Sequence, residues 1–190
     1  MTAAARRRHI LSIDDGPFDK FRDAEALIVG VVTAGPSLVE GVLTTRVPID
    51  GDDITLRLAR WASGSRFFPA LRAILVEGIT MAGLSVIDLP LLHRETGLPA
   101  ISVDRKPPEP GRLEETLARL GFSARLASVA AAGPLHAAGG GMHFACAGLS
   151  PEDAGDLIER ERGRSRLPEG IRIAHLIGQA VVLGESKGRA

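Results

Sequence analysis

The sequence is poor in features typical of secreted and membrane proteins. Its 190 residues include one cysteine, Cys146, so neither an internal disulfide nor a cysteine-based zinc cluster can form. No run of 18 apolar residues occurs, and the sequence therefore predicts no membrane-spanning segment. The arginines at 6–8 do not open a signal peptide, because Asp14 and Asp15 interrupt the apolar run that starts at Ile10. We therefore predict a cytoplasmic protein.

Net charge and large aromatic side chains are also scarce. Lysine plus arginine equals aspartate plus glutamate at 23 each, so no global charge attracts a nucleic acid or a membrane surface. The chain has no tyrosine and one tryptophan, which leaves six phenylalanines as the main candidates for stacking on bases. Any binding of a polyanion must therefore depend on local features. The length and the 45% hydrophobic content fit a single domain over residues 1–190.

The order of hydrophobic patterns predicts an α/β domain. Three strands come first and two more follow with a helix between them, so we expect a mixed five-stranded sheet flanked by helices. The predicted strands are residues 9–14, 26–33, 37–49, 70–78 and 98–106. Helices are predicted from residue 54, over 88–97 and about 111–120, from Ser150, and over 167–183. The segment 128–148 is less informative, and there we expect a strand near 142–147 and a loop at 139–141.

Acidic side chains stand at the ends of two predicted strands. Asp14 ends the first strand, on the same side as Ile10 and Ser12, and Glu77 ends the fourth strand in the apolar stretch AILVEG. If the two strands are neighbours, the carboxylates converge and need protonation or a divalent ion to coexist. Oxygen ligands without cysteine favour magnesium or manganese over zinc. The alternative interpretation is that both acids form turns or caps.

The histidines differ in how much they indicate. His175 shares a helical stripe with Ile171 and Gly178 and is predicted to face inward, either as a hydrogen-bonded core residue or beside a metal. His136 and His143 flank the glycine-rich loop without further ligands nearby. A metal site at this second pair is therefore the weaker hypothesis.

Other charged residues have a structural and a functional interpretation. Asp52 and Asp53 precede a predicted helix, where free amides favour negative charge and capping is the first interpretation. Arg105 and Lys106 end the fifth strand, on the side where Asp14 and Glu77 should emerge. The run ERERGRSR at 159–166 is typical of a solvated face. Acids that hold a metal beside cations suit phosphodiester hydrolysis.

Several blocks of the sequence resemble one protein family. The blocks occur in the same order almost from end to end and are IDDGPF, VPIDGDDIT, ILVEGITMAGLSVIDL, TGLPAISVDRKP, AGLSPEDA and RLPEGIRIAHLIGQAVVLGESKGRA. The chain is similar to the endonuclease dU family, a largely archaeal group long catalogued as a domain of unknown function. That family in turn looks like a distant relative of endonuclease V, a ribonuclease H-like nuclease that uses a divalent metal on deaminated bases.

The resemblance to endonuclease V implies roles for three acids. Asp14 matches the first metal-binding carboxylate, and Asp53, eight residues before Trp61, matches the acid that opens a helix. Glu77 falls where endonuclease V has aspartate. The extra methylene moves this carboxylate by about one bond, which affects metal geometry.

The same resemblance implies a cation and a histidine. Arg105 matches the lysine of endonuclease V without a gap, whereas Lys106 matches it only with one insertion. His175 matches the histidine of the RxAH motif. Asp15 belongs to the endonuclease dU pattern alone. We expect it to be a turn residue or to hydrogen-bond near the metal ligands without binding the metal itself.

We therefore expect a ribonuclease H-like endonuclease that acts on DNA containing deoxyuridine. The resemblance implies magnesium or manganese held by Asp14, Glu77 and Asp53, with His175 orienting water or receiving its proton, and Arg105 or Lys106 stabilising phosphate charge. Two alternatives remain open. One is a non-catalytic module that binds nucleic acid or a nucleotide, and the other is a metal-dependent hydrolase of a small phosphorylated metabolite.

Overall fold

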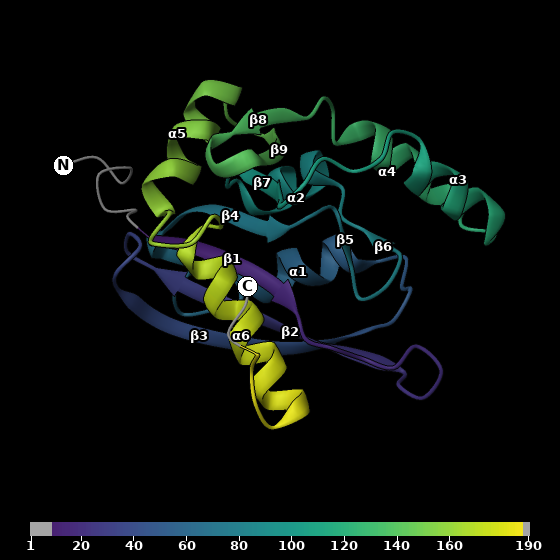
Figure 1. The fold of residues 1–190 in the computed structure, drawn as a ribbon, viewed down its shortest axis with the longest axis horizontal. Coiled ribbons are helices and arrows are strands. Elements are labelled where there is room, and N and C mark those ends of the chain that lie inside the picture. Colours follow the sequence, from purple (N-terminus) through teal and green to yellow (C-terminus); the bar gives the residue numbers. More distant parts are fainter. Residues whose placement is uncertain (1–8, 188–190) are drawn as a thin grey trace.

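A computed structural model of the protein describes residues 9–187, and its centre is a seven-stranded mixed sheet (Figure 1). The sheet has the order β3-β2-β1-β4-β7-β9-β8. Its strands are β1 (His9–Asp15), β2 (Glu25–Thr33), β3 (Val39–Pro48), β4 (Leu71–Glu77), β7 (Ala100–Asp104), β8 (His136–Ala138) and β9 (Met142–Ala147). A separate small hairpin pairs β5 (Thr80–Met81) with β6 (Ser85–Val86).

Six α-helices occur in the described residues. They are α1 (Ile54–Ser63), α2 (Leu89–Thr96), α3 (Arg112–Arg119), α4 (Leu126–Ala131), α5 (Pro151–Glu161) and α6 (Glu169–Leu183). Short 3-10 turns occupy Phe68–Ala70, Ser123–Arg125 and Gly139–Gly141. No helix between residues 9 and 187 is long and apolar enough to cross a membrane.

The direction of the strands decides where their ends meet. β1, β2 and β3 pair antiparallel, β4 runs parallel to both β1 and β7, and β9 pairs antiparallel with β7 and β8. The carboxyl ends of β1, β4 and β7 therefore share one edge of the sheet. The predicted mixed α/β sheet is confirmed. The predicted number of five strands is too low, because β8 and β9 extend the sheet beyond β7.

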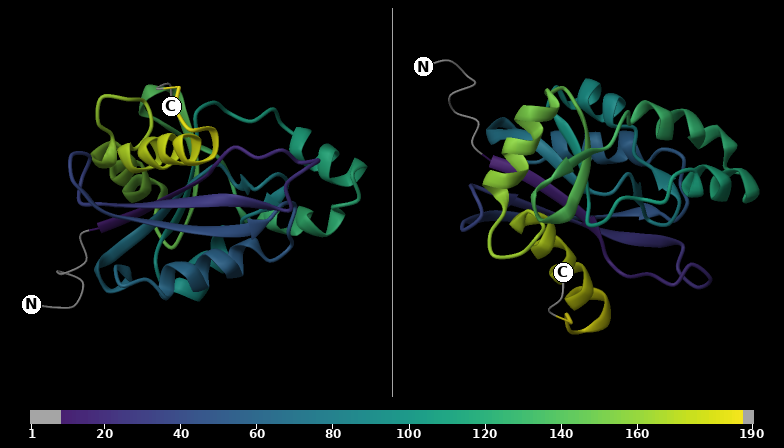
Figure 2. Two further views of the ribbon diagram at one scale, coloured as in Figure 1. Left: turned by 90° about the horizontal axis from the view of Figure 1, so that it is seen from below. Right: turned by 45° about the horizontal axis from the view of Figure 1, so that its top comes forward.

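Helices cover both faces of the sheet. Figure 2 shows α5 and α6 on one face and α1 on the other. On the first face, apolar side chains of α5 and α6 such as Ile158 and Ile171 pack on Ile10 and Leu75. On the second face, helices α1 and α2 pack on strand residues that include Leu11 and Ile74, through side chains such as Leu58 and Leu92. The sheet is thus buried on both faces at its centre. Polar side chains are therefore accommodated at the ends of its strands.

Two helix starts follow the capping signals in the sequence. The Asp88 carboxylate accepts a hydrogen bond from Leu91 N (2.8 Å), and α2 ends at Gly97 in the left-handed conformation. The Ser150 hydroxyl accepts from Asp153 N (3.1 Å) at the start of α5. Both helices begin within one residue of the predicted position.

Candidate metal centre

Two acidic side chains meet at the carboxyl edge of the sheet. Asp14 lies near the end of β1 and Glu77 ends β4, and these strands are parallel neighbours. Alternation along β1 places Ile10, Ser12 and Asp14 on the face that α6 covers, as the contacts of Ile10 with α6 confirm. The sequence therefore folds so that both carboxylates point to the same side of the sheet.

Helix α6 brings the third group of the site. It approaches β1 closely because two of its residues lack side chains: a Cβ at Gly170 would lie 2.4 Å from Ser12 Oγ, and one at Gly178 would lie 2.9 Å from Gly16 Cα. His175 lies between these two glycines on the helix. Its Nδ1 comes within 2.9 Å of Asp14 Oδ2 and 4.0 Å of Glu77 Oε2.

These three side chains could hold a metal ion. Asp14, Glu77 and His175 each offer one ligand atom, and the three atoms lie within 4.8 Å of one another. No other such group occurs in residues 9–187. A pocket of about 430 Å³ opens over them, and its lining is Asp14, Asp15, Gly16, Pro17, Phe18, Glu77 and His175. Ligand atoms and open space are therefore both present.

Asp14 is the most buried of the three, with 5% of its surface exposed. Burial raises the pKa of the Asp14 carboxyl to about 7, against the lowering effect of the hydrogen bond from His175, and Glu77 adds to the rise. The hydrogen bond to Asp14 in turn raises the pKa of His175. Near neutral pH the pair therefore holds a proton that a bound cation would displace.

The hydrogen bonds around His175 define its tautomer. Gln179 Oε1 accepts from Lys187 N (3.0 Å), so the amide group of Gln179 donates to His175 Nε2, also at 3.0 Å. Nδ1 then carries the hydrogen that His175 donates to Asp14. Gln179 was not predicted as a site residue, although its position one helical turn after His175 was a usable signal.

Glu77 has one paired oxygen and one unpaired oxygen. Arg105 Nε donates to Glu77 Oε1 at 2.6 Å. Glu77 Oε2 is buried and finds no hydrogen-bond partner among the described residues. An unpaired buried carboxylate oxygen is costly in a folded protein, and a divalent cation would satisfy it. The two carboxylates thus fit a metal ion, with the unpaired Glu77 Oε2 as the free ligand atom, while the imidazole is engaged by Asp14 and Gln179.

Asp15 is the last residue of β1 and lines the pocket. Its Oδ2 accepts a hydrogen bond from Ala82 N at 2.6 Å, which ties the end of β1 to the β5–β6 hairpin. Burial raises the pKa of Asp15, against the lowering effect of the Ala82 amide. Whether Asp15 supports the site or only shapes the turn stays a prediction.

The structure does not bring Asp53 or Lys106 to this cluster. Asp53 is the residue before α1, and its carboxylate accepts from Arg57 Nε at 2.7 Å in an exposed pair. Arg57 lowers the pKa of Asp53. Lys106 is exposed, whereas Arg105 is the basic residue in contact with Glu77. Asp52 pairs instead with the buried Arg125, at 2.7 Å.

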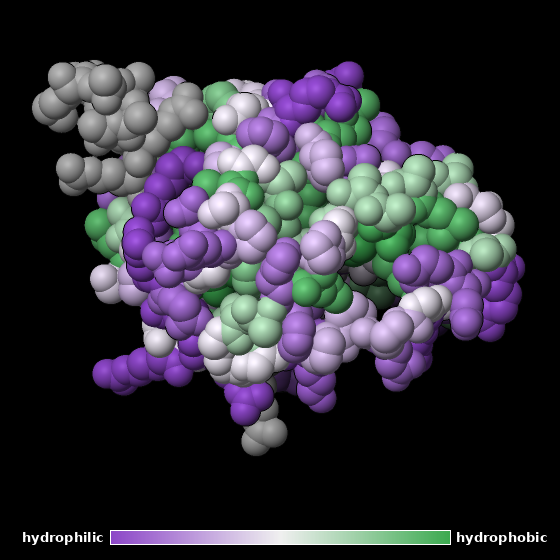
Figure 3. Space-filling view, turned by 90° about the horizontal axis from the view of Figure 1, so that it is seen from above, coloured by the Kyte–Doolittle hydropathy of each residue, from purple (hydrophilic) through white to green (hydrophobic). Residues whose placement is uncertain are grey.

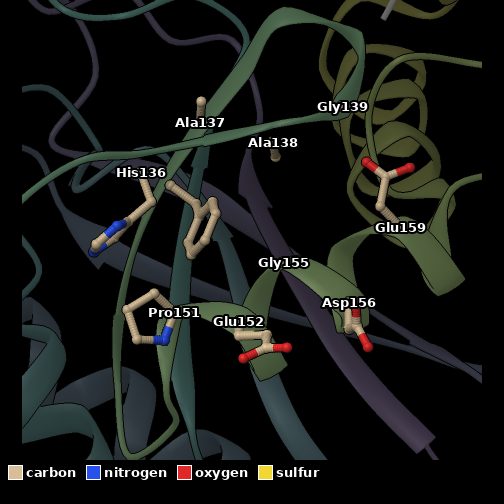
Figure 4. Close-up of a pocket in the computed structure, with 10 residues that line it drawn as sticks. His136, Ala137, Ala138, Gly139, Pro151, Glu152, Gly155, Asp156 and Glu159 are labelled. Atoms are coloured by element: carbon tan, nitrogen blue, oxygen red, sulfur yellow. The ribbon is translucent and has the colours of Figure 1, made fainter.

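The other two histidines lie on β8 and β9. His136 packs on the ring of Phe144, with centroids 5.4 Å apart, and borders a hollow of about 430 Å³. Figure 4 shows that the carboxylates around this hollow come from one helix, α5: Glu152, Asp156 and Glu159. Asp156 and Glu159 pair with arginines of their own segment. His143 lies opposite Asp104 across β7 and β9. Neither histidine joins a metal-binding group in the described residues.

Comparison with known proteins identifies related sequences. The profile of the family described as Endonuclease dU matches residues 6–182. A UPF0215 protein of Methanothermobacter thermautotrophicus is 40% identical over 185 residues, covering 95% of this chain and 91% of the relative. A UPF0215 protein of Methanopyrus kandleri is 41% identical over 187 residues, covering 95% and 94%.

Solved structures show where the fold recurs. A protein of unknown function from Archaeoglobus fulgidus superposes with a TM-score of 0.85 at 32% identity, covering 93% of this chain and 99% of that one. Endonuclease V of Ciona intestinalis, in complex with DNA containing an inosine, gives a TM-score of 0.57 at 14% identity, covering 90% and 84%. Human ENDOV gives 0.55 at 16% identity, covering 88% and 81%. The predicted likeness to the endonuclease V fold is confirmed.

Proposed function

The chain belongs to the endonuclease dU family, and on that premise we propose that it is a metal-dependent endonuclease that cleaves DNA at deaminated bases, with deoxyuridine as its target. The observation that carries the proposal is the convergence of Asp14, Glu77 and His175 in an open pocket at the sheet edge. A likeness to a DNA-bound endonuclease V fold supports nucleic acid as the substrate.

Asp14 and Glu77 are the residues that we assign to the metal. Carboxylate oxygens favour magnesium or manganese, and the unpaired Glu77 Oε2 is the atom most in need of a cation. Such an ion, when bound, would activate a water molecule and neutralise charge on the leaving oxygen of a phosphodiester. We leave Asp53 out of the ligand set because Arg57 already pairs with it at the surface.

The surrounding residues position the acids and the phosphate. His175 donates from Nδ1 to Asp14 and so fixes the direction of the buried carboxylate, while Gln179 holds the imidazole from the other side. Arg105 is 39% exposed at its side chain and borders Glu77, which places a fixed positive charge beside the pocket. We assign to Arg105 the binding of a phosphate oxygen of the substrate.

A second recess lies beside the metal centre and is the place that we assign to the base. It has a volume of about 390 Å³, within the range of small-ligand pockets. Ile79 and Thr80, which directly follow Glu77 and Gly78, line one side, and Asp104, which precedes Arg105, lines another. Val129 and Leu135 add apolar surface, and Figure 3 shows apolar surface gathered on the side of α3 and α4.

The direct test is a nicking assay on a DNA duplex with one deoxyuridine, with manganese or magnesium present. Asp14→Asn is expected to reduce cleavage at least 100-fold, because the variant loses the negative oxygen that a cation requires. Circular dichroism should show the fold intact. Asp156→Asn is the matched control, since this exposed carboxylate of α5 pairs only with Arg160. Asp53→Asn is also expected to retain cleavage.

Undiminished nicking by Asp14→Asn would refute the assigned centre. Loss of cleavage in Asp53→Asn would return that residue to the ligand set. Equal cleavage of a duplex with thymine in place of uracil would refute the target while leaving a nuclease.

One observation favours a non-catalytic module of the same fold. Arg105 already neutralises Glu77 at 2.6 Å, so the described residues balance part of the site's charge without a cation. A module that only binds nucleic acid would show no cleavage of any oligonucleotide and no tight manganese site by calorimetric titration.

A further inference from the structure

The loop between β1 and β2 connects the metal centre to the surface. It spans residues 16–24, and its first three residues, Gly16, Pro17 and Phe18, line the pocket above Asp14. Figure 1 shows this loop, in purple, projecting beyond the sheet. The right-hand view of Figure 2 shows the same projection. A molecule bound in the pocket therefore lies against the first residues of this loop.

The tip of the loop carries an exposed aromatic ring. Phe21 is 85% exposed, the highest value for a large apolar residue in the described part of the chain. Lys20 lies next to it, with Nζ 4.9 Å from the ring centroid, and Arg22 on the other side has an 86% exposed side chain. The packing of the fold leaves this ring uncovered, so a partner can reach it.

The loop is held in shape by its own hydrogen bonds. Phe21 N donates to Asp19 Oδ1 at 2.9 Å, and Asp19 N donates to Asp23 Oδ2 at 2.8 Å. The amides of Arg22 and Asp23 both donate to Asp19 O. The ring is therefore presented on a preformed turn, and little conformational entropy is lost when a partner covers it.

The acids of the loop limit the part that charge plays. Asp19 and Asp23 offset the charges of Lys20 and Arg22, and Arg22 Nε lies 3.6 Å from Asp19 Oδ2. Since the loop has no net positive charge, electrostatic attraction to phosphates is weak. The exposed face of the ring is the main binding feature, and nucleobases offer flat faces that stack on phenylalanine irrespective of sequence.

We propose that Phe21 is a stacking residue that packs on an exposed nucleobase of DNA next to the phosphate at the metal centre. The inference rests on the proposed function. Phe21 lies three positions after Phe18 in the pocket, a reach of at most about 11 Å. Nucleotides of one strand are spaced about 3.4 Å apart along a duplex, so the stacked base lies within about three nucleotides of the pocket.

The test is binding of a fluorescently labelled DNA oligonucleotide in EDTA, where no metal-dependent cleavage takes place. Phe21→Ala is expected to weaken the binding of single-stranded DNA about 5- to 100-fold, the range found when one stacking ring is removed. Phe21→Trp should bind as well as the wild type or better. Binding of a fully paired duplex should change less, because its bases already stack on each other.

Leu38 provides the matched control. It is 51% exposed in the turn between β2 and β3, at the opposite end of β2 from the loop. Leu38→Ala removes an exposed apolar side chain away from the metal centre and should leave affinity within about twofold. In Phe21→Trp, the new indole emission should be quenched when DNA binds. Trp61 is only partly exposed and gives the background signal in the wild type.

The outcomes separate this inference from the proposed function. Equal affinity of Phe21→Ala and wild type would overturn the inference, whether or not the protein cleaves DNA. Binding that depends on Phe21, in a protein that never cleaves with manganese, would overturn the nuclease and leave the stacking residue. If Phe21→Ala instead changes the oligomeric state by light scattering and leaves DNA affinity unchanged, the ring serves contact between copies of the chain, and the inference fails.

Discussion

At the scale of single residues, Asp14 combines burial with a hydrogen bond from His175 and repulsion from Glu77. Burial raises the pKa of the Asp14 carboxyl to about 7, so below that pH the Asp14–His175 pair holds an additional proton until a cation displaces it. Metal affinity is therefore expected to rise with pH through about 7, as the pair with His175 loses its proton. The same titration predicts how the metal-free protein responds to pH.

The metal-free protein should lose stability between pH 5 and pH 8. The pKa of Asp14 rises on folding from 3.8 to about 7, so the folded state holds more protons than the unfolded state in this window. The raised pKa of His175 acts in the same direction. Both contributions are present at low pH and disappear as pH rises through the folded pKa values. Thermal unfolding in EDTA measures the effect.

Asp14→Asn is expected to flatten this pH dependence and to be more stable than the wild type at pH 8. Asp156→Asn, which changes an exposed carboxylate, should keep the decline of the wild type. A wild-type melting temperature that does not fall between pH 5 and pH 8 would show that Asp14 is ionised without cost.

The sequence predicts the acids better than it predicts their partners. Asp14 and Glu77 are recognisable because each ends an apolar run, where an unpaired carboxylate is costly. The contact of Arg105 with Glu77 depends on the direction of the Arg105 side chain after β7. The hydrophobic pattern of the neighbouring residues does not predict that direction. Asp53 shows the same limit of sequence-based prediction. An acid at the start of a helix gives the same sequence pattern whether it caps the helix, pairs with an arginine or binds a metal.

At the scale of elements, α6 decides whether the site exists. Its glycines let the helix axis approach β1 until His175 reaches Asp14. The helix itself follows from its hydrophobic pattern, and its predicted span, 167–183, begins within two residues of the observed start at Glu169. The close approach of α6 to β1 cannot be predicted from the pattern of the helix, because it depends on Ser12 and Gly16 in a distant part of the chain.

Gly178→Ala is expected to damage both stability and cleavage. The added methyl group would lie 2.9 Å from Gly16 Cα and 3.5 Å from Asp15 O, so the helix must move away from β1. Overpacking of this kind costs about 1–3 kcal/mol. The displaced His175 should also reduce cleavage. Chemical denaturation and the nicking assay measure the two effects.

Gly155→Ala in α5 is the matched control for Gly178→Ala. A methyl group there would meet only Phe144, at 3.8 Å, which is ordinary contact. The change should stabilise the protein slightly, because alanine favours helix over glycine. If both variants behave alike, close packing of α6 is not what positions His175.

The elements missed by the sequence are short. β8 has three residues, His136–Ala138, and α4 has six, Leu126–Ala131, and both lie in the region rich in alanine and glycine. Neither has enough residues for a periodic pattern to emerge. β8 forms because β9 offers it a partner edge, which is a tertiary cause.

At the scale of the whole molecule, a bound ion would connect strands β1 and β4 at the sheet edge. Ligands that bind only the folded state stabilise it, by about 2.7 kcal/mol at 100 times the dissociation constant. Manganese should therefore raise the melting temperature of the wild type by several degrees. Glu77→Gln should show little rise, while Asp156→Asn should respond as the wild type does. An equal rise in all three proteins would place the ion elsewhere.

The zero net charge of the molecule follows from its composition. Any binding of a polyanion therefore depends on local groups of charged residues. The described residues place the metal centre beside Arg105, and the carboxylates of α5 line a separate hollow. The composition provides no overall attraction to a polyanion. The local charge of each surface depends on where the fold places a few arginines.

The late position of α6 in the chain has a consequence for protein synthesis. His175 follows Glu77 by 98 residues. At a translation rate of about 5–20 residues per second, both carboxylates leave the ribosome roughly 5–20 seconds before the imidazole does. During that interval a nascent chain has an incomplete centre. If the proposed centre needs His175 to hold Asp14, it is complete only after α6 has packed on β1.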